Sequence, residues 1–272
     1  MTWGGILENL VADFAFVVLI TPLFATIVLA FTRWRPHAKL IRFLGCTPES
    51  KLVVVYFSNL NIQRGGAGDF RGQSRTYSGS AVPESEYALI QTISGAVEAP
   101  VNDWVSRLFS GLVDKVPGRA IKQWLGPFRV EVQYKLSPLA TPATAPKAVT
   151  ICLGSAGYNS MTDHYARTLQ PLMWFSLDIP KELMQAEGPP IVHDGDIGLL
   201  HRLTVERGHV AYIAAGLGVN GTRGALRFLF SNWESLQRTY GEMDFAVALA
   251  FPWVSDDPTG RRPPIEIAEL SR

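Results

Sequence analysis

The residues best suited to chemistry lie in a glycine-rich stretch, residues 216–224, with the sequence Gly-Leu-Gly-Val-Asn-Gly-Thr-Arg-Gly. An apolar run before it, residues 210–215, predicts a strand, and the apolar spacing after it predicts a helix. Glycines let a phosphate approach the backbone amides at a helix N-terminus, where an arginine adds positive charge. The spacing Gly-x-Gly-x-x-Gly is that of dinucleotide-binding loops. We therefore expect an anion or nucleotide to contact Gly216, Gly218, Asn220, Gly221, Thr222 and Arg223.

This glycine loop departs from a dinucleotide-binding loop in two respects. It belongs to the last strand–helix unit of the chain rather than the first. The acidic residue expected about 20 positions further on, at the end of a strand, is missing, and Asp256 lies about twice as far away. The alternative interpretation is a tight turn in which the strand packs closely against the helix.

A second loop, residues 154–163, also follows an apolar run, residues 148–153. Ser160 and Asp163 fit a capping box, which predicts that a helix begins there. The loop is not a nucleophile elbow, because Leu153 stands where Gly-x-Ser-x-Gly requires glycine. Its polar side chains and amides suit a phosphate or a ribose, and the alternative is a plain turn. The expected ligand contacts are Gly154, Ser155 and Asn159.

A third loop, residues 58–69, is polar and glycine-rich, and we expect it to be a lid over a ligand or a flexible loop without a function. Ser58 and Asn59 at its start are further candidate contacts. The cluster His193-Asp194-Gly195-Asp196 has metal-binding residue types, but its spacing matches no metal motif, and Asp-Gly is common in turns.

The elements that must position these loops alternate along the chain. Continuous apolar runs at 52–57, 148–153, 210–215 and 245–251 are typical of strands buried on both faces of a parallel sheet. Helical spacing follows Pro83 and Thr222. The pattern predicts a Rossmann-like, mainly parallel α/β sandwich, in which ligands collect at the carboxyl ends of the strands.

Two segments fit this pattern less directly. Residues 128–136 alternate between polar and apolar, which favours an edge or antiparallel strand. Residues 101–125 form a basic amphipathic pattern broken by Pro117-Gly118. They are expected to pack on the sheet, with an interfacial position on a membrane as the alternative.

An uncharged run, residues 14–32, predicts a single transmembrane helix, because 19 residues at 1.5 Å each span about 28 Å. Basic residues follow the run and none precedes it, so residues 1–13 are expected outside and the rest in the cytoplasm. A cleaved signal peptide needs a basic start and a shorter apolar stretch, and a buried helix is the other alternative. The expected division continues with a basic juxtamembrane segment (33–50), a cytoplasmic α/β domain (51–255) and an exposed tail (256–272).

Composition narrows the class of partner. The net charge is +1, which does not favour double-stranded nucleic acid. The two cysteines, Cys46 and Cys152, form no metal or redox motif. The expected partners are the lipid bilayer of a cell inner membrane and a nucleotide-derived ligand, with self-association and any cofactor left open.

Three motifs together resemble a group of prokaryotic membrane-anchored proteins. They are the Gly-Ser-x-x-x-Asn-x-x-Thr loop at 154–162, the Asp-x-Gly-hydrophobic turn at 196–199, and the glycine loop that ends at Gly221-Thr222. At the level of the fold, residues 50–250 resemble the Rossmann-like sensor and effector domains of bacterial conflict systems, related to TIR and nucleoside deoxyribosyltransferase-like domains. The resemblance implies a nucleotide-derived ligand. It does not place a catalytic glutamate, because Glu84, Glu86 and Glu234 stand in no matching motif.

These observations predict a membrane-anchored cytoplasmic domain that binds a nucleotide or another phosphate-bearing ligand. Two alternatives stay open: an enzyme that processes a nucleoside or NAD, and a membrane-tethered interaction module without a ligand.

Overall fold

The computed structural model describes residues 14, 36–47, 50–60, 81–98, 130–139, 142, 148–176, 182–205, 209–251 and 265–272. The helices are α3 (Glu84–Tyr87), α4 (Ile90–Val97), α7 (Ser160–Thr168) and α8 (Val219–Tyr240), and residues 36–43 are also helical. The larger sheet contains β1 (Leu52–Phe57), β2 (Glu131–Leu136), β3 (Val149–Leu153), β7 (Asp196–Thr204), β8 (Val210–Gly216), β9 (Phe245–Phe251) and β10 (Ile265–Ser271). A smaller sheet contains β4 (Met173–Phe175), β5 (Glu182–Gln185) and β6 (Ile191–Val192).

The larger sheet has the strand order β10-β9-β7-β8-β3-β1-β2. Four neighbours, β2, β1, β3 and β8, are parallel, whereas β7 is antiparallel to both β8 and β9. The predicted α/β class with a mainly parallel sheet is therefore confirmed. The prediction of an edge or antiparallel strand at residues 128–136 is met by β2, which lies at the edge of the sheet and runs parallel to β1. One correction concerns β7, which is absent from the predicted strands.

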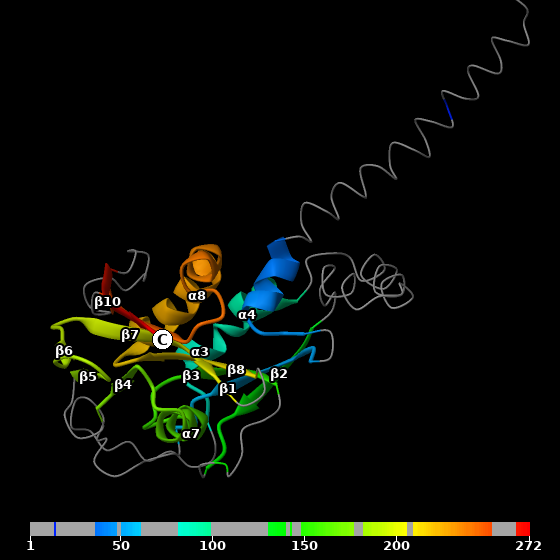
Figure 1. The fold of residues 1–272 in the computed structure, drawn as a ribbon. Helices are drawn as coiled ribbons and strands as arrows, with labels where there is room; N and C mark the ends of the chain where they lie inside the picture. Colours follow the sequence, from blue (N-terminus) through cyan, green and yellow to red (C-terminus); the bar gives the residue numbers. More distant parts are fainter. Residues whose placement is uncertain are drawn as a thin grey trace, which may run out of the picture.

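Side chains of the central strands alternate between two apolar layers, because successive residues of a strand point to opposite faces. In β8, Tyr212 and Ala214 join one core, and Ile213 and Ala215 join the other. Figure 1 shows α8, α4 and the helix of residues 36–43 on one face of the sheet, and α7 with the small sheet on the other. Burial on both faces explains why these strands are continuously apolar.

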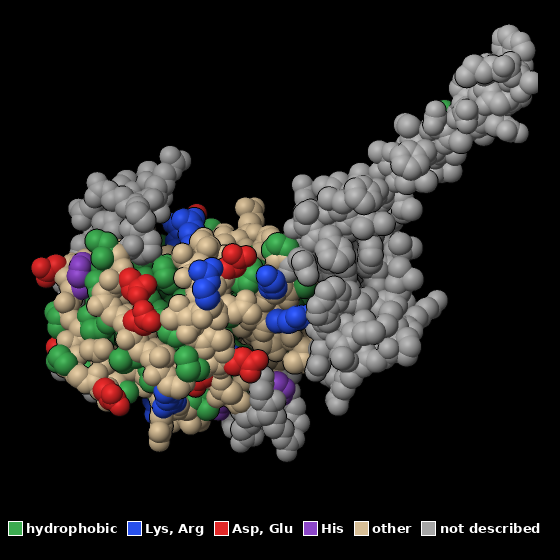
Figure 2. All heavy atoms as spheres, turned by 45° about the horizontal axis from the view of Figure 1, so that its top comes forward, with side chains coloured by type: hydrophobic (Ala, Val, Ile, Leu, Met, Phe, Trp, Pro, Cys, Tyr) green, Lys and Arg blue, Asp and Glu red, His purple; other side chains and the backbone are tan. Residues whose placement is uncertain are grey.

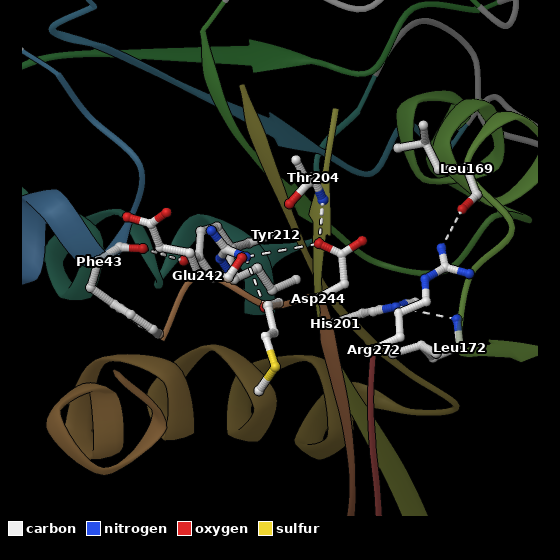
Figure 3. A network of polar contacts seen from close by, with 11 residues as sticks. Phe43, Leu169, Leu172, His201, Thr204, Tyr212, Glu242, Asp244 and Arg272 are labelled. Carbon is white, nitrogen blue, oxygen red and sulfur yellow. Dashed lines mark hydrogen bonds and ion pairs between the residues drawn. The ribbon is translucent and has the colours of Figure 1, made fainter. Parts of the chain in front are cut away.

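The helix of residues 36–43 belongs to the domain core rather than to a separate juxtamembrane segment. Ile41 and Leu44 are completely buried, and His37 Nε2 lies 2.8 Å from the Val97 carbonyl oxygen. The Tyr212 hydroxyl donates to the Phe43 carbonyl at 2.7 Å (Figure 3). The predicted domain boundary at residue 51 is therefore too late, since the fold includes residues from 36 onward.

The expected exposed tail also contributes to the sheet. Residues 265–271 form β10, which pairs antiparallel with β9 at the edge, and its side chains are exposed or half-buried. Arg272 then donates from Nη2 to the Leu169 carbonyl at 2.9 Å (Figure 3). The last eight residues are therefore part of the fold.

Several predictions lie outside the described residues. Of the predicted span 14–32 only Phe14 is described, and residues 1–13, 61–69 and 101–125 are not. Within the described ranges, no helix has the length and apolar character needed to cross a membrane.

Candidate functional site

The carboxyl ends of β1, β3 and β8 lie at one edge of the sheet, because these strands are adjacent and parallel. This edge brings together the second loop, the glycine loop and residues 58–60, the described start of the first loop. The Asn59 amide donates to the Tyr158 carbonyl at 2.8 Å, which joins the first loop to the second. The Gly154 amide donates to the Ala214 carbonyl at 2.9 Å, which joins the second loop to β8.

In the glycine loop before α8, the anion is a carboxylate of the chain itself. The amides of Gly218 and Gly221 each donate at 2.7 Å to Asp196, one to each carboxylate oxygen. Asp196 begins β7 and is 1% exposed. Burial raises the pKa of Asp196, and the hydrogen bonds from the amides of the glycine loop oppose that shift. The amides expected to hold a ligand phosphate therefore hold Asp196.

The glycines of this loop allow β7, β8 and α8 to pack closely. A β-carbon on Gly216 would overlap the Thr222 amide nitrogen, and one on Gly221 would overlap the Ile197 carbonyl. A β-carbon on Gly218 would lie 2.7 Å from the Asp196 carboxylate. These close contacts agree with the alternative interpretation, a tight turn in which the strand packs closely against the helix.

The other predicted contacts of the glycine loop lie within α8. Asn220 and Thr222 are buried. Arg223 is half-buried, and its Nε has no hydrogen-bond partner in the described part of the chain. Burial lowers the pKa of Arg223, and the nearby charge of Arg227 lowers it further.

In the second loop, Asn159 is the N-cap of α7. Its Oδ1 accepts from the amides of Met161 and Thr162, at 3.0 and 3.3 Å. Its Nδ2 donates to the carbonyls of Tyr56 and Leu153, at 3.0 and 2.8 Å. The predicted start of the helix at residue 160 is confirmed, but the capping side chain is Asn159 rather than Ser160. Asn159 is completely buried, and its four hydrogen bonds hold the loop together.

Ser58 and Gly154 meet a buried acid, Glu86 of α3. The Ser58 amide donates to Glu86 Oε2 at 2.7 Å, and the Ser58 hydroxyl donates to the Leu153 carbonyl at 3.0 Å. Gly154 has φ of +92°, and a β-carbon there would overlap the Ser58 hydroxyl. Burial raises the pKa of Glu86 to about 7, against the opposing hydrogen bonds from Ser58. Asn59 likewise faces inward, donating from Nδ2 to the Ser137 carbonyl at 3.2 Å.

A cavity of about 790 Å³ opens beside the second loop. It lies between α7, the small sheet and the β7–β8 face of the larger sheet. Of the residues predicted from the sequence, only Ser155 lines it. Its volume is within the range of small-molecule sites, which are mostly apolar with a few polar groups. The apolar lining includes Met173, Trp174, Met184, Leu199 and Ile213.

The polar lining of this cavity includes two arginines at the C-terminal end of α7. Arg167 donates from Nε to Asp163 Oδ1 at 2.8 Å, one helical turn away. The Asp163 side chain is 3% exposed and the Arg167 side chain is 64% exposed, so a buried carboxylate orients an accessible guanidinium. Arg272 lines the same end through its contact with Leu169. The arrangement suits an anionic group attached to an apolar body.

The sequence contained only a weak signal for these residues. Asp163 and Arg167 have the i,i+4 spacing of a helical ion pair, which is common on protein surfaces. Glu86 was visible only as an acid in a first helical turn, and Asp196 only as part of an Asp-Gly turn. Their roles depend on partners distant in the sequence.

Metal ligation finds no support in the described ranges, where no group of three or more His, Cys, Asp or Glu side chains could hold a metal ion. His193 Nδ1 instead accepts from the Gly195 amide at 2.8 Å. His201 is completely buried, burial lowers its pKa to about 3, and its Nε2 accepts from the Leu172 amide at 3.3 Å (Figure 3).

Comparisons of the chain with protein-family models, with curated proteins and with solved structures gave no match. The geometry of the site is therefore the only basis for a proposed function.

Proposed function

We propose that this chain is a membrane-anchored α/β domain of Rossmann-like type that binds a nucleotide or another phosphate-bearing ligand. The observation that carries the ligand proposal is the cavity beside α7, with an arginine pair at one end and apolar walls along its length. A phosphate engages the guanidinium groups of Arg167 and Arg272. The apolar walls, which include Trp174, cover a base.

The cavity supports this proposal better than the glycine loop does. In the glycine loop, the amides of Gly218 and Gly221 already donate to Asp196, and displacing that buried carboxylate would leave it without these bonds. In the cavity, Arg167 donates from Nε to Asp163. The guanidinium group also has two terminal nitrogens, whose N–H groups can donate to a ligand. Ser155 and Thr162 add further polar groups to the lining.

Ligand-dependent thermal stability tests the binding proposal. A panel of AMP, GMP, NAD and inorganic pyrophosphate is added to the purified full-length chain. A ligand present at 100 times its Kd stabilises the folded state by about 2.7 kcal/mol, which raises the melting temperature. Arg167→Ala should abolish the shift, whereas Arg227→Ala, which removes an exposed arginine on α8, should retain it. A panel without any shift would favour the interaction-module alternative.

A second candidate function is an enzyme that acts on a nucleoside or NAD, and Glu86 is the observation that favours it. A buried carboxyl with a pKa near neutrality, at the carboxyl ends of parallel strands, is suited to proton transfer. Release of nicotinamide or a free base from NAD or a nucleotide would support this candidate, provided that Glu86→Gln abolishes the release.

The membrane anchor rests on the uncharged run at 14–32 and the basic residues after it. A reporter fused after Arg272 should be active only in the cytoplasm. Deleting residues 1–35 should release the domain from membranes, because the described core begins at residue 36. Periplasmic reporter activity or continued membrane integration of the truncated chain would overturn the proposed topology.

A further inference from the structure

A second hollow lies on the other face of the large sheet, between the helix of residues 36–43 and α8. It has a volume of about 400 Å³. We call it the basic groove and define it by the residues that line it: Lys39, Trp233, Glu234, Gln237 and Arg238. We propose that the basic groove binds the headgroup of an anionic phospholipid in the membrane that holds the anchor.

The helix of residues 36–43 presents its charge outward from a fixed position. His37, Leu40 and Ile41 on this helix are buried, whereas Lys39 is exposed. Phe43 lies with its ring centroid 6.5 Å from that of Trp233, which packs the helix against α8. Lys39 and Arg238 therefore lie on two helices that pack into the same hydrophobic core. Figure 2 shows Lys and Arg side chains on this face of the molecule, with acidic side chains beside them.

The position of the basic groove along the chain identifies the occupant. This inference rests on the proposed anchor, which ends at Thr32. The four residues from there to Pro36 span at most about 14 Å, so the helix that carries Lys39 begins close to the bilayer surface. Anionic headgroups attract lysine and arginine side chains that lie within a Debye length of the surface. Tryptophan side chains are favoured at the same depth, and Trp233 is half-buried in the groove.

Glu234 lines the same groove as Lys39 and Arg238, and its carboxylate is exposed. Substitutions at these three positions therefore test whether the groove binds an anion. An anionic headgroup is attracted by Lys39 and Arg238 and repelled by Glu234. Lys39→Gln and Arg238→Gln should each weaken docking, while Glu234→Gln should strengthen it. If these residues only stabilised the fold, replacing a cation and replacing Glu234 would not change docking in opposite directions.

The experiment uses the full chain, reconstituted into vesicles of phosphatidylcholine alone or of an equimolar mixture with phosphatidylglycerol. A dye is attached at Ser235→Cys, an exposed position on α8 beside the groove. Cys46 and Cys152 are buried, and burial raises the pKa of the Cys46 thiol to about 12, so the new thiol reacts first. Glu187→Cys, in the turn between β5 and β6, gives the control label on the other side of the sheet.

Quenching of the dye by spin-labelled headgroups measures docking. We expect stronger quenching at 235 when phosphatidylglycerol is present and no such difference at 187. Each removed cation should lower the ratio of docked to undocked chains about fivefold, and Glu234→Gln should raise it by a similar factor.

Flotation of the vesicles separates the two proposals. If the chain floats with the vesicles but quenching at 235 is the same in both lipid mixtures, the groove proposal is wrong and the anchor stands. If the chain does not float, the anchor is wrong and the groove proposal falls with it. If inorganic phosphate in phosphatidylcholine vesicles changes the dye signal as much as phosphatidylglycerol does, the groove is a site for a free anion, which also overturns the proposal.

Discussion

The two loops that follow β3 and β8 have similar sequence patterns but differ in the side chain that caps the helix after each loop. Both lead from a buried parallel strand through glycines into a helix N-terminus. Asn159, directly before α7, caps that helix from within its own loop. Asp196, from the antiparallel strand β7, caps α8 from outside its loop. Only the loop after β3 borders the cavity beside α7.

The difference shows that the sequence pattern of strand, glycine loop and helix predicts where a helix begins. The pattern does not identify the group that accepts hydrogen bonds from the first amides of that helix. The positive end of a helix attracts an anion of any origin. In α8 that anion is a buried carboxylate 22 to 25 residues away in the sequence from the amides it accepts. An anion-binding motif can therefore serve internal packing, and the ligand is better sought where an accessible cation borders a cavity.

Removing the two caps should have unequal effects. Asp196→Ala leaves the buried Gly221 amide and the part-buried Gly218 amide without this acceptor and should lower the free energy of unfolding by about 4 kcal/mol. Asn159→Ala should lower it by about 2 kcal/mol, the range for loss of an N-cap. Chemical denaturation of both variants measures the difference.

Added phosphate sharpens this comparison. In Asp196→Ala it should restore part of the lost stability by filling the vacated anion site at α8. In Asn159→Ala it should not, because the lost amide also donated to two carbonyls, which an anion cannot replace. Equal rescue of both variants would contradict the distinction between the loops.

Glu86, which adjoins the loop after β3, makes stability depend on pH. Burial raises its pKa from the ordinary value of 4.5 to about 7 in the folded chain, so the folded state holds the proton more tightly. Stability from this group is present below about pH 4.5 and is lost as pH rises to about 7, by an amount on the order of 3 kcal/mol. Glu86→Gln should remove this contribution, so the difference in unfolding free energy between the parent and the variant should change across that window. A difference that stays constant with pH would show that Glu86 is not a titrating group in this window.

His201 should produce a slope of the opposite sign. Burial lowers its pKa from the ordinary value of 6.5 to about 3 in the folded chain, so the unfolded chain binds the proton more tightly. Stability from this group is therefore present above about pH 6.5 and lost as pH falls toward 3. Comparing Glu86→Gln with the parent at each pH isolates the glutamate contribution, because the histidine is present in both.

Replacing one glycine by alanine in each loop should again distinguish the two loops, with smaller losses of stability. Gly154→Ala places a side chain at φ of +92° and against the Ser58 hydroxyl, so we expect a loss of about 2 kcal/mol. Gly218→Ala has no such backbone strain and needs only a shift of the Asp196 carboxylate, so we expect about 1 kcal/mol. Melting temperatures of the two variants rank them, and the reverse order would contradict the packing described here.

Much of the fold follows from the sequence, because continuous apolar runs identify strands that are buried on both faces. The runs at 52–57, 210–215 and 245–251 became β1, β8 and β9. β7 was missed for a physical reason: its run, Asp196–Thr204, contains charged and polar residues that look like surface. His201 and Arg202 are buried all the same, because Leu172 donates to the histidine and the carbonyls of Glu242 and Met243 accept from the arginine (Figure 3).

Less of the candidate site could be predicted. The edge of the sheet where the loops gather follows from parallel strands, but most of the expected contacts there already bond within the protein. Asn159 caps α7, and Ser58 bonds to Glu86. The cavity is built by α7 and a small sheet of short strands, whose pairing no local pattern reveals. Ser155 is the one predicted residue that lines it.

The central claim is that the ligand binds in the cavity beside α7 and not in the glycine loop of α8. Calorimetric titration of AMP into the parent, Arg167→Ala and Arg223→Ala tests it most directly. Arg167 lines the cavity, and Arg223 belongs to the glycine loop. We expect AMP to bind the parent, Arg167→Ala to weaken binding at least about tenfold, and Arg223→Ala to bind like the parent. Loss of binding in Arg223→Ala with full binding in Arg167→Ala would contradict the claim and return the ligand to the glycine loop.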